Sequence, residues 1–228
     1  NGRQGRLVKN WEGSNSYRGW TTSREGIVRS MNVMAVKTIT DVTPATAVDY
    51  LLRFGFTSLV LEGPQADYNQ SAALGGLTNG VSNLELTAAY AAIANGGSYI
   101  RPRLYTKVVD NDGNVVLDNQ PEANQAISEQ NAWLLIDCMK DVISGSGGTG
   151  TAAKLDGMTA AGKTGTTSDN LDIWFEGSTP YYTAGLWAGY DNSGYKHSLA
   201  NSETQFHKKL WAKVMNRIHE GLENKDFE

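Results

Sequence analysis

The chain has 228 residues, of which 40% are hydrophobic and 9% aromatic, and this composition excludes intrinsic disorder as the default state. Twenty Lys and Arg residues stand against 24 Asp and Glu residues, which gives a formal net charge of −4. No basic run is interleaved with aromatic residues, so composition and charge argue against nucleic acid as a partner.

The sequence also argues against a membrane span and a metal site. The longest uncharged apolar stretch, Leu86 to Ile100, is shorter than the roughly 20 residues that a helix needs to cross a bilayer. The single cysteine, Cys138, rules out an intramolecular disulfide, and its surroundings are typical of the buried face of a helix. The three histidines lack partners at metal-ligand spacing, so a metal site is not expected.

The first half of the chain is predicted to be mainly helical. Thr22-Ser23-Arg24-Glu25 has the form of a capping box and predicts a helix that runs toward Arg29. A break is expected at Ser30-Met31-Asn32, and an apolar helical pattern resumes at Val33. Ser30 is therefore expected at a helix boundary.

Two further helices are predicted from their end signals. Thr43-Pro44 begins a helix that stops at Gly55, because proline is favoured at the first helical position. A second capping box, Ser82-Asn83-Leu84-Glu85, begins an alanine-rich helix that ends at Gly96-Gly97. Its alanines favour the helix and allow close packing.

In the middle of the chain the hydrophobic pattern changes from the period of a helix to that of a strand. The strings TKVVD and NVVLD flank an Asp112-Gly113 turn signal and predict a small hairpin. Ser128 is expected to cap a helix from about Glu129 to Ile143. The glycine-rich passage SGSGGTGTAAK that follows predicts a mobile connector.

The last part of the chain predicts strands and a closing helix. LDIWFEG and YYTAGLWAGYD are expected to be strands joined by a turn at Ser178-Thr179-Pro180. In the final helix an apolar stripe at i, i+4 spacing predicts the buried face: Phe206, Leu210, Val214 and Ile218, widened by Trp211 and Met215.

The order of these elements predicts one α+β domain over residues 1–228 with an antiparallel sheet. Residues of about 1–145 are expected to form its mainly helical part. Residues of about 146–228 are expected to supply three sequential strands and the C-terminal helix.

The stretch GMTAAGKTGTT, residues 157–167, allows two interpretations. Gly157–Thr164 matches the phosphate-loop string G-x-x-x-x-G-K-[ST], while Lys163-Thr164-Gly165 matches the third element of the serine enzymes that react with penicillin. A phosphate loop leaves a buried strand and enters a helix, whose free N–H groups bind the phosphates. The segment before Gly157 is polar and Thr164 is followed by poor helix formers, so nucleotide binding is disfavoured.

The residues around Lys163 favour an extended strand instead. Thr164, Thr166 and Thr167 favour extended backbone, and Gly165 lets another group approach closely. On Lys-Thr-Gly alone, a plain edge strand with a solvated lysine is the simpler interpretation. The longer string AAGKTGTTSDNLDIWFEGSTPYYTAGLWAGYD decides against it.

That string resembles the transpeptidase domain of penicillin-binding proteins, most closely the bifunctional class A kind that builds bacterial peptidoglycan. TTSREGIVRSMNVMAVK resembles the second-motif region of the family, and GGLTNGVSNLELTAAYAAIANGG resembles its central helix. Asn83 departs from the proline that the family often has there. The resemblance implies a serine β-lactamase/transpeptidase-like fold, in which an antiparallel sheet is flanked by helices beside an all-helical subdomain.

The resemblance also implies site residues. Ser30 and Asn32 would form the S-x-N element, in which Ser30 passes a proton toward the leaving amine and Asn32 hydrogen-bonds a substrate amide. Lys163 would hold positive charge near that proton path and the substrate carboxylate. Residues 164–166 would bind the substrate or a β-lactam: the two threonine hydroxyls would hold the carboxylate, and the Thr166 N–H would donate into an oxyanion hole.

The nucleophile of the family, a serine that opens a helix as S-x-x-K, is expected to lie outside these residues. The one S-x-x-K string, Ser193-Gly194-Tyr195-Lys196, is typical of a turn rather than a helix. The literal S-D-N string, Ser168-Asp169-Asn170, shares one short segment with Lys163, roughly 16 Å long if extended, so their side chains do not converge. An upstream segment is expected to supply the serine, its lysine and two further strands of a five-stranded sheet.

The implied reaction is acyl transfer through a serine ester, without a cofactor. The implied partners are a peptidoglycan stem peptide ending in D-Ala-D-Ala and β-lactam antibiotics. The implied location is extracytoplasmic, through an N-terminal membrane anchor outside these residues. The 228 residues alone are expected to be inactive. Two alternatives stay open: a non-catalytic module that binds peptidoglycan peptides or β-lactams, and a phosphate-loop nucleotide-binding protein.

Overall fold

The computed structural model describes residues 7–13, 17–191 and 197–228. Its first part holds three helices: α1 (Ser23–Val28), α2 (Asn32–Val42) and α3 (Pro44–Arg53). Thr22 caps α1 by accepting a hydrogen bond from the Glu25 N–H, as predicted. The expected break at 30–32 is one residue too long, because Asn32 already belongs to α2.

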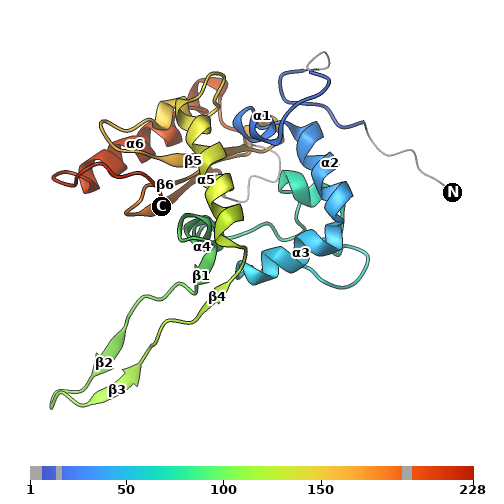
Figure 1. Ribbon diagram of the computed structural model, residues 1–228. Coiled ribbons are helices and arrows are strands. Elements are labelled where there is room, and N and C mark those ends of the chain that lie inside the picture. The colour runs from blue at the N-terminus through green and yellow to red at the C-terminus, as the bar shows by residue number, and fades with distance from the viewer. Residues whose placement is uncertain (1–6, 14–16, 192–196) are drawn as a thin grey trace.

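Two longer helices follow in the order that their caps predict. A short η1 turn (Gln70–Leu74) precedes α4 (Asn83–Ala94), and Ser82 and Glu85 form the reciprocal capping box of α4. Helix α5 (Glu129–Ser144) is capped by the Ser128 hydroxyl, as predicted. In Figure 1, α5 runs between the α1–α3 helices and the main sheet.

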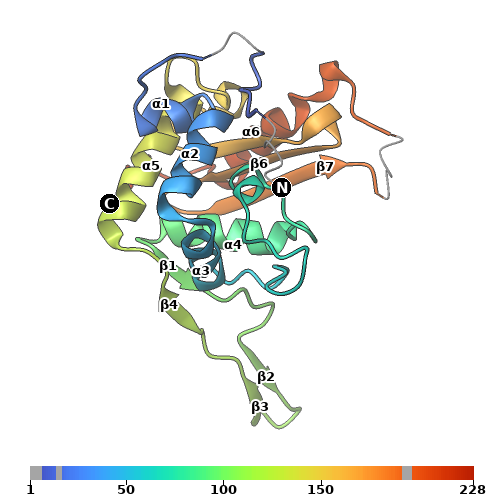
Figure 2. The same ribbon diagram turned by 90° about the vertical axis from the view of Figure 1, so that its right-hand side faces the viewer.

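Between α4 and α5 the chain forms a projecting arm. Strand β1 (Ser98–Ile100) pairs with β4 (Ala123–Gln125), and β2 (Lys107–Val109) pairs with β3 (Val115–Asp118), both antiparallel. The predicted β2–β3 hairpin is confirmed, whereas the β1–β4 pair was not predicted, because no tight turn joins these two strands in the sequence. Figures 1 and 2 show the hairpin extending well away from the rest of the molecule.

The main sheet has three antiparallel strands in the order β5-β6-β7: β5 (Ala161–Thr166), β6 (Asp172–Ser178) and β7 (Thr183–Gly189). Helix α6 (Phe206–Ile218) covers one face, while α4 and α5 pack on the other. The register sets Lys163 opposite Glu176 and Thr164 opposite Phe175. Within the described residues no strand pairs with the second edge of β5.

The predicted buried stripe of α6 is only partly correct, because its widening residues Trp211 and Met215 are buried but its four i, i+4 residues are not. Its four i, i+4 residues are 42 to 48% exposed: Phe206, Leu210, Val214 and Ile218. The buried face instead centres on Trp211 and Met215, at 2% and 0% exposure. Trp211 packs edge-on against Phe175 of β6 and donates its indole N–H to the Ala184 carbonyl of β7, so this one side chain sets the rotation of the helix.

The glycine-rich passage after α5 packs against the fold rather than running free. Gly150 N–H donates to the Val142 carbonyl of α5, and the η2 turn (Thr151–Ala153) buries Ala153 completely. Short turns also lie between β5 and β6, η3 (Ser168–Asn170), and before α6, η4 (Asn201–Glu203). Cys138 is only half-buried, and burial raises the pKa of its thiol.

Candidate active site

The centre of the site is a contact between Ser30 and Lys163. The Lys163 ammonium donates to the Ser30 hydroxyl at 2.7 Å and to the Thr164 carbonyl at 2.9 Å. Although 133 residues separate them, the α1–α2 turn and strand β5 bring the two side chains together. Burial removes the ammonium from water and lowers the pKa of Lys163 to about 8.

Ser30 occupies a tight turn between α1 and α2. Its N–H donates to the Ile27 carbonyl and the next N–H, of Met31, donates to the Gly26 carbonyl. These bonds require a left-handed backbone at Ser30, with φ of 53°, which costs a non-glycine residue roughly 1–2 kcal/mol. The turn thus holds Ser30 in one strained conformation with its hydroxyl against Lys163.

Asn32, the first residue of α2, lies on the same turn. Its side-chain amide donates to the Lys9 carbonyl at 2.9 Å. Helix α1, which carries the turn, is fixed to α5 by Arg24, whose guanidinium forms ion pairs with Asp137 and Asp141. The S-x-N turn therefore takes its position from both the N-terminal segment and α5.

Strand β5 presents its side chains to two faces, since successive residues of a strand alternate. Lys163 and Gly165 share a face with Glu176 and Trp174, whereas Thr164 shares the opposite face with Phe175. The Thr164 hydroxyl forms a 2.8 Å hydrogen bond with the Thr149 hydroxyl. Thr166, at the exposed end of the strand, is open to solvent.

Thr149 is held in turn by α6. The buried Lys208 ammonium donates to the Thr149 carbonyl at 3.1 Å. Sequence reasoning missed both residues, because it took the glycine-rich passage as a connector and α6 as a covering helix.

Gly165 leaves little space for a larger side chain, since a Cβ at this position would lie 3.2 Å from the Trp174 Cβ.

The other candidate strings do not join this site. Ser193 and Lys196 lie outside the described residues. Ser168-Asp169-Asn170 forms the η3 turn, where the Asn170 amide donates to the Asn201 side chain at 2.9 Å. Lys163 and Thr164 lie inside β5, which continues into η3 and the antiparallel β6. The arrangement lacks the helix N-terminus that a phosphate loop needs.

The part of the chain that the structure describes has neither a candidate metal site nor a candidate membrane span. No cluster of His, Cys, Asp and Glu there is suited to hold a metal ion. No helix there has both the length and the apolar character to cross a membrane.

Known proteins match this chain over most of its length. The family model for the penicillin binding protein transpeptidase domain matches residues 1–215. Penicillin-binding protein 1A of Clostridium botulinum is 34% identical over 212 residues, which cover 93% of this chain and 25% of that protein. Penicillin-binding protein 1A/1B of Bacillus subtilis is 31% identical over a gapped alignment of 236 residues that covers 95% of this chain and 24% of that protein.

Solved structures share the fold. Penicillin-binding protein 1A from Haemophilus influenzae superimposes with a TM-score of 0.81 at 21% identity, covering 97% of this chain and 37% of that one. The penicillin-binding protein PonA1 from Mycobacterium tuberculosis superimposes with a TM-score of 0.80 at 22% identity, covering 97% of this chain and 61% of that one. These likenesses confirm the predicted α+β transpeptidase fold.

The chain spans 25% of the Clostridium botulinum protein and 24% of the Bacillus subtilis protein. The resemblance seen in the sequence, the fold and the matched family model agree with one another. The chain belongs to the penicillin-binding protein transpeptidase domain family, of the kind found in class A penicillin-binding proteins.

Proposed function

We propose that this domain serves a peptidoglycan D,D-transpeptidase that works through a serine acyl-enzyme and is acylated by β-lactams. The observation that carries the proposal is the 2.7 Å contact between the Lys163 ammonium and the Ser30 hydroxyl, beside the open edge of β5. In this proposal an upstream segment of a longer polypeptide, carrying the S-x-x-K helix, supplies the nucleophilic serine.

The proposed acylation moves one proton through Ser30. The nucleophile attacks the D-Ala-D-Ala carbonyl and gives its proton to the lysine of its own helix; a C–O bond forms and the C–N bond breaks. The leaving amine takes its proton from the Ser30 hydroxyl, which is replenished from that lysine. Lys163 keeps a positive charge beside this path, and Asn32 hydrogen-bonds a substrate amide. An acceptor amine then attacks the ester carbonyl: a new C–N bond forms, the C–O bond breaks, and the proton lost by the amine returns to the serine oxygen.

The substrate is proposed to bind along the free edge of β5 as an extended peptide. Its terminal carboxylate would meet the hydroxyls of Thr164 and Thr166, with Thr149 orienting the first of them. The Thr166 N–H would donate to the developing oxyanion, and Gly165 between them keeps the edge free of a side chain. We place the domain outside the cytoplasmic membrane, held by an N-terminal anchor of the longer polypeptide.

The test is intact-mass analysis of the full-length protein and of the 228-residue chain after incubation with benzylpenicillin. A single stoichiometric adduct is expected on the full-length protein and none on the chain alone. Lys163→Ala is expected to slow acylation by about 100-fold or more, while Lys154→Ala, at an exposed position, leaves the rate unchanged.

Other outcomes point to other functions. An adduct on the 228-residue chain would put a nucleophile within it, and Ser193 would be the first residue to replace. A full-length protein that binds benzylpenicillin reversibly without an adduct would favour the non-catalytic module. Magnesium-dependent binding of labelled ATP would revive the nucleotide-binding alternative.

A further inference from the structure

Three hydrogen bonds tie a short N-terminal segment, the strap (residues 9–11), to the S-x-N turn. The Trp11 indole N–H donates to the Arg29 carbonyl at 2.9 Å. The Asn32 amide donates to the Lys9 carbonyl at 2.9 Å, and the Val33 N–H donates to the Asn10 side-chain oxygen at 3.1 Å. The strap therefore contacts the chain on both sides of Ser30, across 18 to 23 residues of sequence.

The α2 helix begins without a cap of its own. Its N-cap residue, Met31, has no side chain that can accept from the first-turn N–H groups, and no such bond is formed. Asn10 caps α2 from a distant part of the chain, because its side-chain oxygen accepts a hydrogen bond from the Val33 N–H in the first turn of the helix. Asn10 is only 4% exposed, so this bond is shielded from water.

The other two hydrogen bonds of the strap hold the Arg29 carbonyl and the Asn32 side chain, on either side of Ser30. Trp11 is 63% exposed, so its ring contributes little to the core, and its indole N–H is the group that acts on the turn. The bond from Asn32 to Lys9 sets the direction of the Asn32 amide. Ser30 lies between these anchors in its left-handed conformation.

We propose that the strap positions Ser30 and Asn32 for acyl transfer, with Asn10 and Trp11 as positioning residues. The inference rests on the proposed function of the site. Releasing one anchor lets the turn relax from its strained conformation, so that the Ser30 hydroxyl spends less time in line with the leaving amine. The residues of the strap touch neither substrate nor nucleophile in this scheme, and they act through the turn.

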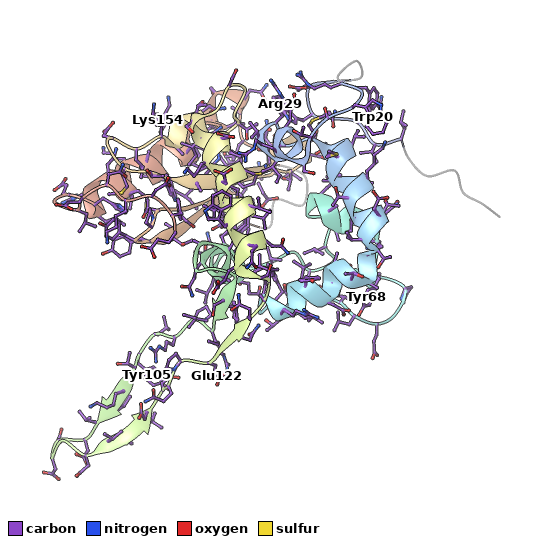
Figure 3. All side chains as sticks on the ribbon, in the orientation of Figure 1. Trp20, Arg29, Tyr68, Tyr105, Glu122 and Lys154 are labelled. Atoms are coloured by element: carbon purple, nitrogen blue, oxygen red, sulfur yellow. The ribbon has the colours of Figure 1, made fainter. Side chains whose placement is uncertain are left out.

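The test separates binding from chemistry in the full-length protein. Trp11→Phe removes the indole N–H and keeps an aromatic ring, and Asn10→Ala removes the distant cap. We expect either change to lower the acylation rate constant for benzylpenicillin about fivefold to tenfold, with unchanged affinity for the non-covalent complex. The matched control is Trp20→Phe, because Trp20, which is labelled in Figure 3, is fully exposed; this variant is expected to react at the wild-type rate.

All rates are measured well below the thermal midpoint of each variant, so that the unfolded fraction is negligible. A Trp11→Phe protein that acylates at the wild-type rate overturns the inference. A loss that lies wholly in affinity, or one that disappears when the variant is fully folded, also overturns it. A wild-type protein that is not acylated at all would instead contradict the proposed function, so the two failures are distinguishable.

Discussion

Lys163 carries a positive charge at a buried position, and burial disfavours the charged form of a lysine. Burial lowers its pKa to about 8, so the side chain loses its proton as the pH rises through that value. In the proposed mechanism the charge faces the substrate carboxylate and the proton path through Ser30. The reactive form of the site is therefore the one that burial makes less stable, and its population is sensitive to pH near neutrality.

We expect the acylation rate of the full-length protein to fall as the pH rises through about 8. Lys163→Arg keeps its charge at these pH values and is expected to remove this alkaline limb, at a lower maximum rate. Benzylpenicillin acylation measured between about pH 6.5 and 9.5 checks both statements. Lys154→Arg is the control, and a wild-type rate that stays constant across this range would contradict the assigned charge.

Residues of the site differ in how far the sequence predicts them. Ser30, Asn32 and Lys163 stand in strings that resemble a known family, so the resemblance could assign them roles. Asn10 and Thr149 contact the site through hydrogen bonds to residues 23 and 15 positions away. Such bonds leave no period or spacing in a single sequence, and only the folded chain reveals them.

Among the secondary-structure elements, helix ends are predicted better than helix rotation. Capping residues lie within a few positions of the backbone groups that they satisfy, so Ser82 and Ser128 mark α4 and α5 correctly. The rotation of α6 depends instead on what lies across the sheet. Phe175 and the Ala184 carbonyl select Trp211 over the i, i+4 stripe.

Because Trp211 is buried and Leu210 is exposed, substitutions at these neighbouring residues of α6 are expected to differ widely in their effect on stability. Trp211→Ala is expected to cost about 3–5 kcal/mol in the free energy of unfolding, because it leaves a cavity against Phe175. Leu210→Ala is expected to cost less than about 1 kcal/mol, because Leu210 is 44% exposed. Urea unfolding of the two variants compares them directly. Equal losses would mean that the exposed stripe is covered in solution.

On the scale of the whole molecule, one buried carboxyl couples the stability of the fold to pH. Glu176 is 2% exposed at the junction of β6 with α4, and its oxygens find no hydrogen-bond partner among the described residues. The nearby Thr87 hydroxyl donates to Asn83. Burial raises the pKa of Glu176 to about 8 from an ordinary value of 4.5, so the folded state keeps a proton that the unfolded chain has already released.

The free energy of unfolding is therefore expected to fall as the pH rises from about 4.5 toward 8. Glu176→Gln should flatten this slope and stabilise the domain at pH 8 by an amount on the order of a few kcal/mol. Denaturant unfolding across this range measures the effect, and Glu62→Gln at an exposed position is the control. An unchanged slope in Glu176→Gln would assign the pH dependence to another group.

The contact between Ser30 and Lys163 closes a loop of 133 residues that contains α4, the projecting arm and α5. The entropy lost in closing so long a loop is recovered only when the elements within it have packed. A chain that has formed its helices but not its sheet would lack the contact between Ser30 and Lys163, because Lys163 lies on strand β5. We therefore expect the contact between Ser30 and Lys163 to be among the last features to form during folding.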